Sequence, residues 1–165
     1  MKNSFLFLSL LSMLLLVSSC SIFNKTKNGD AGASSFSSKK AKAVIASART
    51  KTGAPYKYGA TGDGGYDCSG LVFTSFEEAG IKLPRTSTEQ ATVGRDVVFA
   101  KVRPGDLVFF ATKKGDGKIT HSGIVTEIKE KEVVMFIHAA NSGVREDNLY
   151  APYYFNSFVK AKRVE

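Results

Sequence analysis

Cysteine and histidine are scarce in this sequence of 165 residues, which contains only Cys20, Cys68, His121 and His138. One cysteine and two histidines scattered along the chain lack the close spacing that is typical of zinc ligands, so we expect no metal site and no cofactor. Apolar runs of about 20 residues, the length of a membrane-spanning helix, and internal repeats are absent as well. These absences argue against a membrane-spanning helix and against a repeat architecture.

Acidic residues are outnumbered by basic ones, because the sequence contains 23 Lys and Arg but only 15 Asp and Glu. A basic surface suits an anionic polymer or a membrane surface. The sequence offers no platform on which aromatic and basic side chains alternate, and such a platform is typical of single-strand binding. We therefore expect no nucleic-acid partner.

Residues 1–19 have the pattern of a secretory signal, in which Lys2 precedes an apolar run over residues 5–17 and small residues lead to Cys20. The pattern resembles the lipobox of bacterial lipoproteins, which implies that Cys20 is acylated and anchors the mature chain to a membrane. The alternative is an ordinary thiol. Ser21 follows the anchor, and resemblance to Gram-negative lipoproteins implies the outer membrane, facing the periplasm. In a Gram-positive cell the same anchor implies the outer face of the cell membrane.

The chain after Cys20 divides into a flexible tether over residues 20–40 and one compact domain over residues 41–165. Apolar periodicity and turn residues predict helices over 40–51, from Cys68 to Gly80, and over 87–93. They predict strands over 106–112, 119–128, 132–139 and 158–163, with hairpin turns over 114–117 and 129–131. Helices followed by an antiparallel sheet predict an α+β fold.

Cys68 lies where a glycine-rich loop enters the second predicted helix. Helix amides and the positive end of the helix dipole favour a thiolate there, which makes Cys68 a candidate nucleophile. With Cys20 acylated, Cys68 has no disulfide partner within the chain. The alternative interpretation is a small buried core residue.

His121 and His138 lie in adjacent predicted strands. A turn with an even number of residues makes the numbers of opposed residues sum to 259, which predicts that His121 faces His138 directly. A slip of one residue would place the two rings on opposite faces of the sheet. In the paired arrangement Cys68 would attack an amide carbon, His121 would exchange the proton and His138 would orient His121. The Cys68 amide is one expected oxyanion donor, and the second donor is left open.

Six motifs occur in order along the chain: Pro55-Tyr56-Lys57-Tyr58-Gly59, Tyr66-Asp67-Cys68-Ser69-Gly70-Leu71-Val72, Leu83-Pro84-Arg85-Thr86-Ser87, Pro104-Gly105-Asp106-Leu107, Thr120-His121-Ser122-Gly123-Ile124 and Ile137-His138-Ala139. Together they resemble the NlpC family of cell-wall peptidases. The resemblance implies a papain-like fold, with N-terminal helices packed on a C-terminal antiparallel sheet, and a triad of Cys68, His121 and His138. It also implies hydrolysis of peptidoglycan stem peptides, either between D-glutamate and the diamino acid or at the D-alanyl cross-link.

The same resemblance implies a substrate cleft lined by Tyr58, Asp67, Ser69 and Ser87. Each has an alternative: Asp67 and Ser87 can cap helices, and Tyr58 can simply pack. Arg85 either meets a substrate carboxylate or is a solvated charge, and we favour the solvated charge. Two alternative functions are a non-catalytic wall-binding lipoprotein and an acyltransferase that uses the same thiol. We expect a monomer.

Overall fold

The computed structural model describes residues 30–113, 115 and 117–164, with side chains from residue 38 onward. The predicted signal peptide, Cys20 and the first part of the tether lie outside the described residues. So do Lys114 and Asp116 of one predicted hairpin turn.

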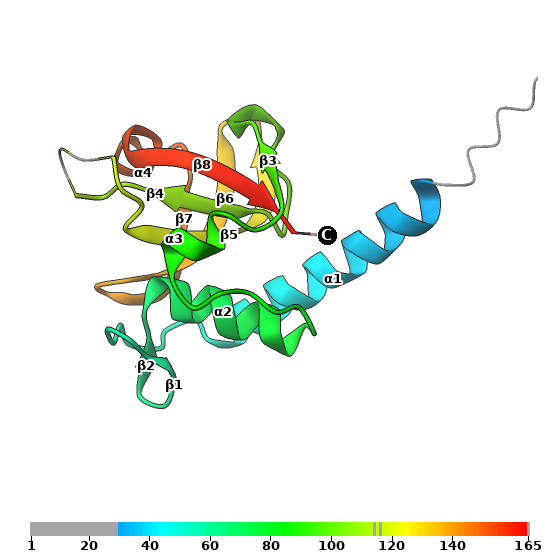
Figure 1. Ribbon diagram of the computed structural model, residues 1–165. Helices are drawn as coiled ribbons and strands as arrows, with labels where there is room; N and C mark the ends of the chain where they lie inside the picture. The colour runs from blue at the N-terminus through cyan, green and yellow to red at the C-terminus, as the bar shows by residue number, and fades with distance from the viewer. Residues whose placement is uncertain (1–29, 114, 116, 165) are drawn as a thin grey trace, which may run out of the picture.

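The first helix, α1 (Asp30–Thr50), begins earlier than predicted, so the second part of the expected flexible tether is helical. Ala and Lys, which recur in this segment, are good helix formers. The end of α1 packs on the domain, because Val44 and Ala48 are buried. Its beginning extends away from the domain (Figure 1).

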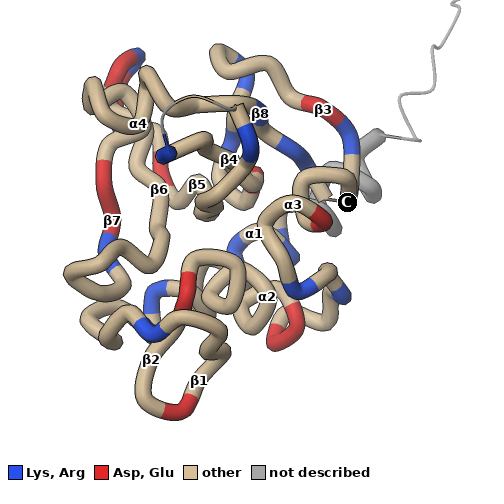
Figure 2. The backbone as a smooth tube through the Cα atoms, turned by 60° about the vertical axis from the view of Figure 1, so that its left-hand side comes forward, with Lys and Arg blue, Asp and Glu red and all other residues tan. Residues whose placement is uncertain are grey.

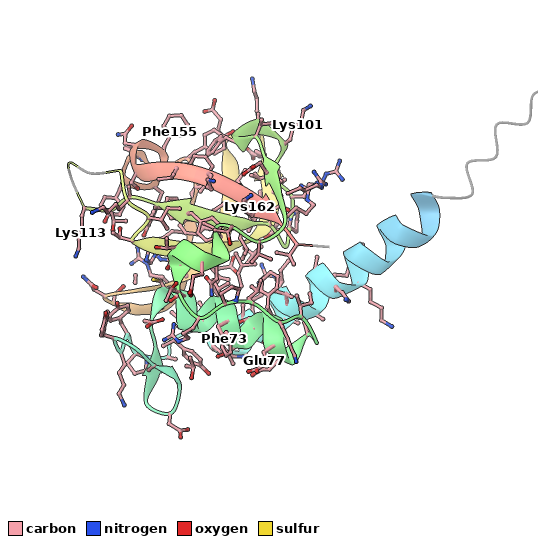
Figure 3. The ribbon with its side chains drawn as sticks, in the orientation of Figure 1. Phe73, Glu77, Lys101, Lys113, Phe155 and Lys162 are labelled. Atoms are coloured by element: carbon pink, nitrogen blue, oxygen red, sulfur yellow. The ribbon has the colours of Figure 1, made fainter. Side chains whose placement is uncertain are left out.

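The second helix, α2 (Cys68–Glu78), confirms the prediction: Ala79 is its C-cap, and Gly80 follows with a φ of 75°. Its apolar face includes Leu71, Val72 and Phe76 and packs towards the sheet, whereas Phe73 and Glu77 extend on the other side (Figure 3). The third helix, α3 (Ser87–Gln90), is shorter than predicted. Ala91 is its C-cap, and the chain then turns through Gly94, which has a φ of 77°, into the first strand of the main sheet.

Six antiparallel strands form the main sheet in the order β3-β8-β4-β5-β6-β7. Their bounds are β3 (Arg95–Val97), β4 (Leu107–Phe110), β5 (His121–Glu130), β6 (Val133–Ala140), β7 (Gly143–Asn148) and β8 (Phe158–Arg163). A short hairpin of β1 (Thr61–Gly62) and β2 (Gly65–Tyr66) lies beside α2, and α4 (Pro152–Ser157) and a 3-10 turn, η1 (Phe99–Lys101), complete the fold (Figure 1). The predicted α+β class is confirmed.

The sheet has a core on each face. On one face α1 and α2 cover Leu107, Ile124 and Ile137. On the other face Phe110 and Phe136 pack against Tyr154 of α4. Since alternate residues of a strand point to opposite faces, Ile124 and Val125 belong to different cores.

The predicted direct opposition of His121 and His138 is wrong. The β5–β6 hairpin pairs Glu130 with Val133, and two irregularities then shift the register until Ile124 pairs with Ile137. Continuing that register brings Gly123 opposite His138, and a Cβ built on Gly123 would lie 3.2 Å from the Cβ of His138. The histidines are therefore diagonal neighbours, two residues out of step, and they still share one face of the sheet.

Candidate active site

Cys68 is the first residue of α2 and is 8% exposed. Asp67 caps the helix, because its carboxylate accepts a hydrogen bond from the Gly70 amide at 2.6 Å. Gly70 is required there, since an added Cβ would lie 2.1 Å from the carbonyl oxygen of Ala60. Among the hydrogen bonds of the described residues none uses the Cys68 amide, so the N–H stays available at the positive end of the helix.

The thiol of Cys68 lies at the end of β5 where His121 begins the strand. Its described polar partners are Ser87 Oγ at 3.7 Å and the carbonyl oxygen of Thr120 at 3.9 Å. Ser87 in turn lies 3.3 Å from Ser122 Oγ. The thiol and its neighbour Ser87 therefore contact the residues on either side of His121. The N-cap of α3 is Thr86, so Ser87 does not have the capping role considered as an alternative.

The two histidines form a hydrogen-bonded pair, in which His121 Nε2 lies 2.8 Å from His138 Nδ1. Burial, and secondarily the neighbouring His138, lowers the pKa of His121 to about 3, so its ring is neutral near pH 7. His138 is 1% exposed and stacks on Phe136, with the ring centroids 4.7 Å apart. Its pKa is lowered by burial, although Asp147 opposes that shift.

Behind His138 lies a group of polar side chains that the sequence did not point to. Asp147 Oδ2 on β7 is 2.9 Å from His138 Nε2, and the hydroxyl of Tyr154 donates to the same oxygen at 2.8 Å. Arg145 donates to both carboxylate oxygens at 2.9 Å. No motif marked these residues, because β7 was not predicted as a strand.

Three of the predicted cleft residues form one network with each other. Arg85 donates to Asp67 Oδ2 at 2.8 Å and to Ser69 Oγ at 2.9 Å. Although burial alone would raise the pKa of Asp67, hydrogen bonds from Arg85 and from the amides of Gly70 and Gly59 hold it below its usual value. The interpretation of Arg85 as a solvated charge is therefore wrong, since its guanidinium is paired with the helix cap.

Tyr56 and Tyr58, both ahead of the cysteine, differ in burial, because the structure covers part of Tyr56 and leaves Tyr58 exposed. Tyr58 is 90% exposed, on a turn closed by Gly59. Tyr56 is half-buried and held by a bridge to Tyr66. Burial, and secondarily the charge of a Cys68 thiolate, raise the pKa of the Tyr56 phenol. Alternation along an extended chain does not separate the two tyrosines, because residues 56 and 58 fall on the same side, so no sequence signal favoured Tyr56.

Within residues 30–113, 115 and 117–164, no group of three or more His, Cys, Asp and Glu is arranged to hold a metal ion. None of the helices in the same part of the chain is long and apolar enough to cross a membrane.

The fold that carries the thiol and the histidine pair is similar to known structures. An NlpC/P60 family protein from Bacillus cereus superposes with a TM-score of 0.67 at 30% identity, covering 74% of this chain and 39% of that one. The peptidoglycan hydrolase RipB from Mycobacterium tuberculosis superposes with a TM-score of 0.63 at 25% identity, covering 79% of this chain and 67% of that one. The fold is therefore that of the NlpC/P60 structures.

Sequence comparison agrees with the structural similarity. The NlpC/P60 family profile matches residues 53–163. The chain is 36% identical over 114 residues to the probable endopeptidase NlpC of Escherichia coli, covering 68% of this chain and 70% of that protein. This chain belongs to the NlpC/P60 family. It spans only 23% of the length of the mycobacterial probable endopeptidases that it matches at 41% identity over 87 residues.

Proposed function

We propose that this protein is a cysteine endopeptidase that hydrolyses stem-peptide bonds of peptidoglycan through a thioester on Cys68. The observation that carries the proposal is the hydrogen-bonded pair of His121 and His138. His121 is the first residue of β5, and the thiol of Cys68 contacts the carbonyl oxygen of Thr120 just before it. Support comes from membership of a family whose matched proteins are named endopeptidases and peptidoglycan hydrolases.

In the proposed mechanism His121 acts as the general base. Its neutral ring takes the thiol proton as the sulfur attacks the amide carbon, and the resulting imidazolium returns a proton to the leaving amine. Water then hydrolyses the thioester and regenerates the thiol. In the free protein the thiol faces Ser87 Oγ and the Thr120 carbonyl. Catalytic hydrogen bonds often tighten only when substrate binds, so this resting geometry is compatible with the transfer.

The oxyanion of the tetrahedral intermediate needs donors that are fixed before the reaction. The Cys68 amide supplies one at the start of α2, where the helix dipole adds to its effect. Tyr56 is the second donor we propose, because it is half-buried, unlike the exposed Tyr58, and its phenol O–H can donate a hydrogen bond. We assign Ser87 to substrate contact next to the thiol, and Asp67, Ser69 and Arg85 to holding that wall of the cleft in place.

We propose as substrate the bond between D-glutamate and the diamino acid or the D-alanyl cross-link. We also propose that Cys20 carries a lipid anchor, with the domain facing the periplasm from the outer membrane. The first part of α1, which extends away from the domain, would then act as a spacer that rises about 1.5 Å per residue from the membrane. Labelling cells with a fatty-acid analogue tests the anchor, and label that persists in Cys20→Ser would refute it.

The first experiment incubates purified peptidoglycan with residues 21–165 and reads the muropeptides by mass spectrometry. Wild type is compared with Cys68→Ala, and Ser75→Ala is the matched control. Ser75 is also a small buried residue of α2, but its hydroxyl has no partner among the described residues and lies outside the proposed mechanism.

We expect new fragments from wild type and Ser75→Ala and none from Cys68→Ala, and their masses identify the bond. Fragments that persist in Cys68→Ala would refute the nucleophile. Binding without cleavage by every variant would favour a wall-binding protein. Peptides joined to a new amine, rather than shortened by water, would favour an acyltransferase.

A further inference from the structure

We infer that Asp147 is a positioning residue: through His138 it fixes which nitrogen of His121 carries a proton, and so leaves the other free to take the proton of Cys68. The inference rests on the proposed function and adds a fourth member to the triad. Asp147 lies on β7, whose neighbouring basic and acidic residues stand out in Figure 2.

The hydrogen bonds from Asp147 to His121 fix which nitrogen of each ring carries a proton. A carboxylate only accepts, so His138 Nε2 must donate its proton to Asp147 Oδ2 across 2.9 Å. A neutral imidazole has one N–H, so His138 Nδ1 is then the acceptor in the 2.8 Å bond to His121. His121 Nε2 therefore carries the proton of that ring. The lone pair of His121 is left on Nδ1, which has no hydrogen-bond partner among the described residues.

Asp147 is held ionised for this role. Burial alone would raise its pKa, but hydrogen bonds from His138, Arg145 and Tyr154 hold the pKa below its usual value. Burial and the carboxylate raise the pKa of Tyr154, so its hydroxyl remains a donor. Because His138 and Tyr154 both donate to Oδ2, the direction of the hydrogen bonds between Asp147 and His121 cannot reverse.

The negative charge also favours proton uptake. When His121 becomes an imidazolium, the paired His138 and the carboxylate behind it stabilise the positive charge. The titratable and charged groups that face one another here are His121 on β5, His138 on β6, Arg145 and Asp147 on β7, and Tyr154 on α4. Asp147 meets neither thiol nor substrate, so it acts through the histidines.

The test measures the thiol directly and needs no peptidoglycan. In residues 21–165 Cys68 is the only cysteine, so the rate of alkylation by iodoacetamide reports its thiolate fraction. Asp147→Asn keeps the shape but replaces an acceptor oxygen with a donor, and Asp147→Ala removes both acceptors. Glu146→Gln is the matched control, because Glu146 is the adjacent acid on β7 and pairs with Arg49 at 2.7 Å with a similar exposure of 24% against 20%.

We expect both Asp147 variants to be alkylated about 10- to 100-fold more slowly than wild type near pH 6.5, the usual range for loss of a supporting partner. At about pH 9.5 all rates should converge, because hydroxide then forms the thiolate without the histidines. Glu146→Gln should follow wild type throughout. Melting temperatures, measured in parallel, report the stability of each variant.

Alkylation of Asp147→Asn within twofold of wild type at every pH would overturn the inference. So would an equal slowing at all pH values, because that is the signature of a merely structural role. Absence of peptidoglycan cleavage by wild type would refute the proposed function, whereas the alkylation profiles would still decide the role of Asp147.

Discussion

Gly123 on β5 is the position at which the smallest change should disturb the histidine pair. A methyl group added there would lie 2.7 Å from Phe136 Cδ2, 2.8 Å from the carbonyl oxygen of Ile137 and 3.2 Å from His138 Cβ. Ordinary contact begins at 3.4 Å, so β6 must retreat by 3.4 minus 2.8, or 0.6 Å, at Ile137. The clash cannot be relieved by a side-chain rotation alone, because one of the crowded atoms belongs to the backbone.

A retreat of that size carries His138 away from His121. The 2.8 Å bond between the rings would lengthen to about 3.4 Å, beyond the about 2.7–3.2 Å range of a good N–H hydrogen bond. We expect Gly123→Ala to lower the free energy of unfolding by about 1–3 kcal/mol through overpacking. A catalytic group that is misplaced by a fraction of an ångström to one ångström loses up to about 100-fold in rate.

Urea unfolding measures the loss of stability, and release of muropeptides measures the loss of turnover. Gly62→Ala is the control, since an added Cβ at Gly62 meets nothing within 4 Å and its φ is not positive. We expect Gly62→Ala to resemble wild type in both assays. If Gly123→Ala were as stable and as active as Gly62→Ala, the placement of His138 against Gly123 would be wrong.

Three further predictions use other parts of the site. Burial lowers the pKa of His121 to about 3, whereas an unfolded histidine titrates near 6.5, so the unfolded chain takes up a proton first on acidification. The contribution of His121 to the free energy of unfolding is therefore full above pH 6.5 and falls towards pH 3 by at most about 1.4 kcal/mol per pH unit. In urea titrations the free energy of unfolding of His121→Gln should fall less steeply with decreasing pH than that of wild type. Arg85→Leu should cost about 1–3 kcal/mol in the free energy of unfolding, because it leaves the carboxylate of Asp67 with fewer donors, and an unchanged urea midpoint would show that the pair is only a surface contact. Tyr56→Phe should slow muropeptide release while Tyr58→Phe does not, and equal rates would remove Tyr56 from the oxyanion site.

Local patterns in the sequence predicted the elements that carry strong signals. The apolar spacing and the glycine of α2, and the bounds of β8, agree with the structure. β7 was missed because Arg145, Glu146 and Asp147 stand together without the apolar alternation of a half-buried strand. It is an edge strand, where charged side chains are typical. The partner of His138 was hidden for the same reason.

The sequence placed His121 and His138 correctly on one face of the sheet, although the predicted register between β5 and β6 was wrong. Side-chain direction in a strand depends only on whether a residue number is odd or even relative to its partner. The opposed pairs sum to 263 beside the turn at Glu130 and Val133, to 262 after one irregularity, and to 261 at Ile124 and Ile137 after the second. A single irregularity would have moved one ring to the other face of the sheet, but two restore the odd sum that the even turn predicted. Nothing in the apolar pattern marks either irregularity. Only the structure could therefore show that His121 and His138 are diagonal neighbours and that the residue opposite His138 is Gly123.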